Sequence, residues 1–65
     1  MPYVEIQIMQ VTAVGSYIGN WMTIQVVEMH DLNIQNAMKQ AQRQYPSGTR
    51  IRAIEQGSGR VIDIL

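Results

Sequence analysis

The spacing of hydrophobic and polar residues predicts one helix in the middle of the chain, between two strand-rich arms. In residues 33–45 (NIQNAMKQAQRQY), apolar side chains recur at offsets of 0, 3, 4, 7 and 11 residues, which places them on one stripe of a helix. The other positions are polar, and alanine, methionine, glutamine, lysine and arginine all favour helix. The predicted buried stripe consists of Ile34, Ala37, Met38, Ala41 and Tyr45.

The ends of this helix are also predicted by local chemistry. Asn33 is one candidate for the N-cap, because an amide oxygen can accept from a free backbone N–H of the first turn. Asp31 is the alternative, and its charge suits the positive end of the helix dipole. Pro46 cannot continue the hydrogen-bond ladder, so we expect the helix to end near Gln44 or Tyr45.

The two arms carry the period of two that is typical of strands. Apolar and polar residues alternate from Val4 to Ile8, and the alternation then changes phase, so we expect a β-bulge near residues 9–10. Glycine, serine and asparagine in residues 15–20 (GSYIGN) and in residues 56–59 (QGSG) predict hairpin turns. The predicted strands cover residues 3–14, 21–29, 49–56 and 60–65.

The resulting order is ββαββ within a single domain of residues 1–65. It predicts an α+β fold with a four-stranded, mostly antiparallel sheet and one helix on one face. A β-grasp arrangement, in which the first and last strands pair in parallel at the centre, has the same order of elements. The other alternative is a different association of the two hairpins, including one across a dimer.

One helix covers one face of a sheet, yet both faces of these strands contain apolar residues. We expect Met22, Ile24 and Val26 to face the helix together with Val4 and Ile6. An apolar surplus then remains on the uncovered face, where it would form a partner interface. The candidate interface residues are Tyr3, Trp21, Val27, Met29 and Val61.

Length and composition favour association with a partner. A chain of 65 residues buries a small core, and oligomerisation is one of the usual sources of extra stability. There is no cysteine, so disulfides are excluded, and one histidine is too few for a histidine-based metal site. Absence of cysteine fits a reducing cytoplasm, and we expect no signal peptide and no membrane span.

The net charge is zero, but the charges are unevenly distributed. Residues 1–38 contain three acidic residues and no basic ones, whereas residues 39–65 contain five basic and two acidic residues. Such asymmetry suggests an anion or nucleic-acid surface, and guanidinium groups bind phosphates well. The candidate contacts are Lys39, Arg43, Arg50, Arg52 and Arg60, unless these side chains are simply solvated.

We find no catalytic, cofactor-binding or metal-binding motif. Residues 57–60 (GSGR) lack the strand–loop–helix context of a nucleotide loop and are interpreted as a hairpin turn. His30 and Asp31 have no nucleophile nearby in the sequence and are interpreted as a segment that leads into the helix. The expected function is therefore that of a non-enzymatic protein-interaction module, for which a homodimer through the open sheet face or an edge strand is one arrangement. Weak nucleic-acid binding is the alternative.

Overall fold

The structure, a computed structural model, describes residues 2–11 and 19–65 of the chain. In chain order it contains β1 (Tyr3–Val11), β2 (Gly19–Glu28), α1 (Asp31–Gln44), β3 (Ile51–Glu55) and β4 (Val61–Ile64). The predicted α+β fold and its ββαββ order are therefore confirmed. Most of the turn expected at residues 15–20, and residues 12–14 of the first predicted strand, lie outside the described residues.

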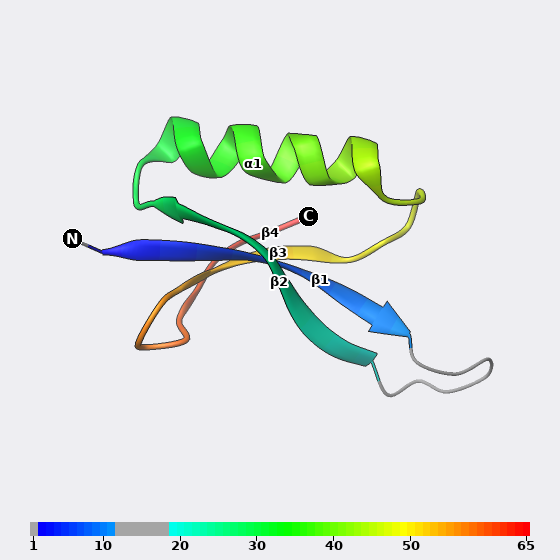
Figure 1. The fold of residues 1–65 in the computed structure, drawn as a ribbon, viewed down its shortest axis with the longest axis horizontal. Helices are drawn as coiled ribbons and strands as arrows, with labels where there is room; N and C mark the ends of the chain where they lie inside the picture. Colours follow the sequence, from blue (N-terminus) through cyan, green and yellow to red (C-terminus); the bar gives the residue numbers. More distant parts are fainter. Residues whose placement is uncertain (1, 12–18) are drawn as a thin grey trace.

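All neighbouring strands of the sheet are antiparallel. The strand order is β2-β1-β3-β4, so β1 and β3 occupy the centre and β2 and β4 form the edges. Figure 1 shows α1 lying along one face of this twisted sheet. The β-grasp alternative is wrong, because the last strand lies at an edge and the first strand pairs with the third in antiparallel orientation.

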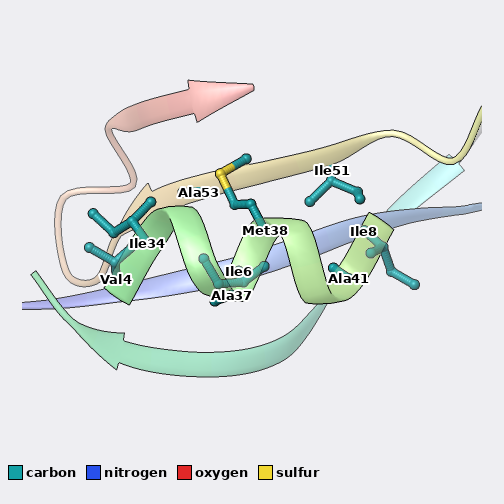
Figure 2. Close-up of a cluster of buried hydrophobic side chains, with 9 residues drawn as sticks. All are labelled: Val4, Ile6, Ile8, Ile34, Ala37, Met38, Ala41, Ile51 and Ala53. Atoms are coloured by element: carbon teal, nitrogen blue, oxygen red, sulfur yellow. The ribbon is translucent and has the colours of Figure 1, made fainter. Parts of the chain in front are cut away.

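The core lies between α1 and the central strands (Figure 2). The helix is about the length at which an isolated helix is marginal in water, so it depends on packing. Each large apolar side chain that it helps to bury contributes roughly 1.5–3 kcal/mol. The core residues are Val4, Ile6, Ile8, Ile51 and Ala53 of the sheet, with Ile34, Ala37, Met38 and Ala41 of the helix.

A bulge in β2 sets which of its residues face the helix. Gln25 lies opposite Ile6 and Thr23 lies opposite Gln7, so Ile24 is the extra residue. The expectation of a bulge at residues 9–10 is wrong, because residues 9–11 pair with β2 in regular register. The bulge lies in β2 instead.

This register corrects the expected faces of β2. Val27 lies opposite Val4 and thus on the helix side of the sheet, and both Val27 and Met29 pack against the core. Val26 lies opposite Glu5, on the face of the sheet away from α1. The expectation that Val26 faces the helix, with Val27 and Met29 on the open face, is wrong. The added residue in the bulge shifts the alternation for every residue that follows it.

The helix begins earlier than expected. His30 is the N-cap, in extended conformation, and its Nδ1 accepts a hydrogen bond from the backbone N–H of Leu32 at 3.3 Å. Neither Asn33 nor Asp31 is the cap, and Asp31 instead supplies a negative charge in the first turn. The predicted end is confirmed, since Gln44 is the last helical residue.

In the described part of the chain, no helix combines the length and apolar character needed to cross a membrane.

Candidate interaction surfaces

The sheet face opposite α1, called the open face below, has side chains ordered in rows across the strands. Residues that lie directly opposite one another on neighbouring strands project to the same side of the sheet. One row runs across all four strands, and a second runs parallel to it. The first row is Val26, Glu5, Ile54 and Val61, and the second is Thr23, Gln7, Arg52 and Ile64.

Polar side chains at the centre of the open face hydrogen-bond to one another. Arg52 Nε donates to Gln7 Oε1 at 2.8 Å, and Gln7 Nε2 donates to Thr23 Oγ1 at 3.1 Å. The Thr23 hydroxyl then donates to Glu5 Oε1 at 2.7 Å. Gln7 is 9% exposed, so its amide is satisfied by these two partners rather than by bulk solvent.

Trp21 lies beside this network on the open face. It is opposite Met9, and the Arg52 guanidinium carbon lies 4.0 Å from the centroid of its ring. That distance is within the range of a cation–π interaction. Arg52 therefore covers one face of the indole and holds the half-buried Trp21 against the sheet.

The β4 side of the sheet is uncovered. Helix α1 approaches β1, β2 and β3, but no Cα atom of α1 lies within 8 Å of one in β4. A helix about 10 Å across cannot cover four strands spaced about 4.8 Å apart. Every side chain of β4 is exposed. Asp63 lies on the helix side but beyond the reach of α1, whereas Val61 and Ile64 project to the open face, on which α1 does not lie.

Ile54, Val61 and Ile64 form an apolar strip on this part of the open face. Val61 lies opposite Ile54, while Ile64 lies one row away, beside Arg52. Val61 is 45% exposed and Ile64 is 64% exposed. Tyr3 and Val26 are also exposed on the open face, but Glu5 separates Val26 from the strip.

The structure divides the candidate interface residues into two groups. Tyr3, Trp21 and Val61 lie on the open face, whereas Val27 and Met29 contribute to the core on the other side. Half-buried Ile54 and exposed Ile64 also lie on the open face, although neither is among the candidates from the sequence. The alternation of apolar residues in 60–65 is the signal that could have indicated Ile64. The bulge at Ile62 shifts this alternation, so Val61 and Ile64 project to the same face.

The five basic residues do not form one surface. Lys39 and Arg43 belong to α1, on the opposite side of the sheet from Arg52. Arg60 follows the turn between β3 and β4 and makes an ion pair with Glu55 at 3.4 Å. Arg50 precedes β3 at the end away from that turn, and Arg52 is engaged by Gln7 and Trp21.

The glycine-containing turn after β3 is closed by its own groups. The Gly59 N–H donates to the Glu55 carbonyl at 2.9 Å, and the Arg60 N–H donates to Ser58 Oγ at 3.2 Å. Gly57 and Gly59 have φ values of 96° and 73°, which explains the glycines. Ser58 Oγ donates to Glu55 Oε1 at 2.6 Å. These bonds fit the interpretation of a hairpin turn.

The residues that the structure describes contain no cluster of three or more histidine, aspartate or glutamate side chains that could hold a metal ion. Comparison with protein families, curated proteins and solved structures finds no match to this chain.

Proposed function

We propose that this chain is a non-enzymatic protein-interaction module that forms a homodimer through the apolar strip of Ile54, Val61 and Ile64. The observation that carries the proposal is the exposure of Val61 and Ile64 of β4 on the face of the sheet opposite the helix. An exposed cluster of branched apolar side chains on a small domain is typical of an interaction surface.

The chemistry of the open face favours protein over nucleic acid. The strip is apolar, and the network beside it uses Arg52 internally through Gln7 and Trp21. The basic residues are spread over separate parts of the molecule, and the net charge is zero. Nucleic-acid binding depends on a concentrated positive surface that releases counterions from phosphates.

A second copy of the chain is a suitable partner because the strip can pack against itself. A two-fold axis brings the same surface of both subunits together, which is the commonest arrangement for homo-oligomers. The polar network of Glu5, Thr23, Gln7 and Arg52 then borders an apolar contact, as at many interfaces. The proposal places the protein in the cytoplasm, since a chain without cysteine needs no oxidising environment.

Sedimentation velocity over a series of micromolar concentrations tests the proposal. The wild-type protein should sediment as a dimer, and Ile64→Lys should shift it toward monomer because a lysine would have to lose its hydration in the contact. Leu32→Lys is the matched control. Leu32 is 61% exposed, close to the 64% of Ile64, but lies at the start of α1.

Far-ultraviolet circular dichroism should show that both variants remain folded. A wild-type protein that stays monomeric throughout the series would rule out the homodimer. Equal dissociation by both lysine substitutions would show that the contact does not use the strip.

A further inference from the structure

The two edges of the sheet differ in how they are protected from pairing with another strand. Edge β4 is four residues long, and Asp63 Oδ1 accepts from the backbone N–H of Ile64 at 2.9 Å. Since the Leu65 N–H donates inward to the Ile51 carbonyl, alternation turns the Ile64 N–H outward. A carboxylate therefore covers a free donor of β4, which is a common protection of edge strands.

Edge β2 lacks this protection. It is ten residues long, and its sequence contains no lysine, arginine or proline and a single charged residue, Glu28. The Met29 N–H donates to the Pro2 carbonyl at 3.1 Å, so the alternating pattern turns the N–H and C=O groups of Glu28 and Val26 toward the free edge. No side chain among residues 2–11 and 19–65 hydrogen-bonds to those backbone groups.

A groove of about 540 Å³ runs beside this edge, between β2 and α1. Half-buried Val27 and buried Ala37 supply its apolar surface. Three helix residues at offsets of 0, 3 and 7 form the opposite wall, consistent with one stripe of a helix. The polar lining consists of Gln25, Glu28, Asn33, Asn36 and Gln40.

The groove has a specific chemistry. Primary amides are both donors and acceptors, and all four amide side chains of the lining are exposed. None of them hydrogen-bonds to another protein group in the described part of the chain. Glu28 is the only charged residue of β2, and it lies opposite Tyr3, so its carboxylate projects to the open face. The amides of the groove therefore favour hydroxyl or amide groups, while the carboxylate favours a positive charge on the other side of the same edge.

We infer that the β2 edge binds an extended segment of a protein partner, which adds to the sheet as an antiparallel strand. The partner's residues opposite Val26 and Glu28 exchange backbone hydrogen bonds with β2, as in other cases of strand addition. The residue opposite Val27 places its side chain in the groove, and a lysine or arginine opposite Glu28 pairs with the carboxylate. The bulge at Ile24 limits regular pairing to residues 25–28.

A second copy of β2 does not supply the same complement. It contains no basic residue to pair with Glu28. Strands β2 and β4 also form the two opposite edges of the sheet, so this inference does not depend on the proposed homodimer. A different protein with a basic, hydroxyl-containing strand therefore fits the site better.

The probe for this inference is the peptide acetyl-Ala-Lys-Thr-Val-Thr-Ala-amide. In antiparallel orientation its lysine lies opposite Glu28, the first threonine opposite Val27 and the valine opposite Val26. Titration into the ¹⁵N-labelled full chain should shift the amide resonances of Val26 and Glu28 and the side-chain amides of Asn36 and Gln40.

Two N-methylated peptides separate strand addition from nonspecific contact. Methylation of the valine nitrogen removes the N–H that donates to Val26, and should weaken binding by about tenfold or more. Methylation of the first threonine nitrogen is the matched control, because that N–H points away from β2, and binding should persist. Glu28→Gln should weaken the lysine peptide more than the same peptide with glutamine in place of lysine.

Three results would overturn the inference. One is the absence of resonance shifts up to the solubility limit of the peptide. Another is equal weakening by the two N-methylated peptides. The third is a dependence of the Val26 and Glu28 resonances on protein concentration without peptide, which would assign the edge to a second copy of the chain.

Discussion

Replacement of Gln7 by alanine should lower the free energy of unfolding by about 2–3 kcal/mol. This is a large effect for a polar residue on the sheet face that the helix does not cover. The reason is that Gln7 is 9% exposed and connects Arg52 of β3 to Thr23 of β2.

The magnitude follows from the two hydrogen bonds of the Gln7 amide. The bond from Arg52 Nε at 2.8 Å involves a charged group, and such bonds contribute about 1.5–3 kcal/mol. The bond to Thr23 Oγ1 at 3.1 Å is between neutral groups and contributes about 0.5–1.5 kcal/mol. Thr23 is exposed and Arg52 is half-buried, so water can hydrogen-bond to both in place of the missing Gln7 amide. The expected loss of stability therefore lies in the lower half of the sum of these two contributions.

Urea denaturation provides the assay. Trp21 is the single tryptophan, and the Arg52 guanidinium carbon lies 4.0 Å from its ring centroid, so its fluorescence reports directly on this region. Gln42→Ala is the control, because Gln42 is an exposed residue of the helix and its loss should change stability by less than about 0.5 kcal/mol. Measurements at low protein concentration keep self-association out of the comparison.

A Gln7→Ala effect no larger than that of Gln42→Ala would refute the reasoning, since the network would then contribute nothing in solution. A double-mutant cycle with Arg52→Ala gives a second check. The coupling between the two positions should be about 1–2 kcal/mol. Additive effects would show that Gln7 and Arg52 do not interact.

Two further predictions concern the helix and the arginines. Met38 is 2% exposed at the centre of the buried stripe, so Met38→Ala should cost about 2–4 kcal/mol by loss of burial and creation of a cavity; calorimetry showing a change as small as that of Gln42→Ala would contradict the packing of α1. Fluorescence anisotropy with a labelled oligonucleotide should show no binding tighter than micromolar at physiological salt. A nanomolar complex that weakens steeply with salt, and that is lost on joint replacement of Arg50 and Arg52 by serine, would instead support nucleic-acid binding.

The order of the elements could be predicted from local patterns. The apolar stripe from Ile34 to Tyr45 has helical spacing, and Pro46 ends the helix by its own chemistry. These features depend on residues within one or two helical turns of each other, so tertiary contacts do not change them. The N-cap could not be predicted in this way. Aspartate and asparagine have a higher intrinsic preference for the N-cap than histidine, yet His30 caps the helix and Asp31 and Asn33 do not.

The faces of β2 depend on tertiary structure. Met22, Ile24 and Val26 form one apolar series along this strand, while Val27 and Met29 continue the other, so the pattern is compatible with either face. Pairing with β1 resolves the choice through the bulge at Ile24. Sequence periodicity cannot locate such a bulge where both phases are apolar.

The candidate surfaces also depend on contacts between distant segments. Gln7 and Arg52 are 45 residues apart in the sequence. Only the antiparallel pairing of β1 with β3 brings Arg52 Nε to 2.8 Å from Gln7 Oε1. Nothing in the local sequence of either residue indicates the other. The spacing of side chains within a helix or strand follows from backbone geometry, so the sequence by itself determines which elements form. The register and order of the strands depend on which arrangement buries the most apolar surface beneath one helix, and only the tertiary structure decides that.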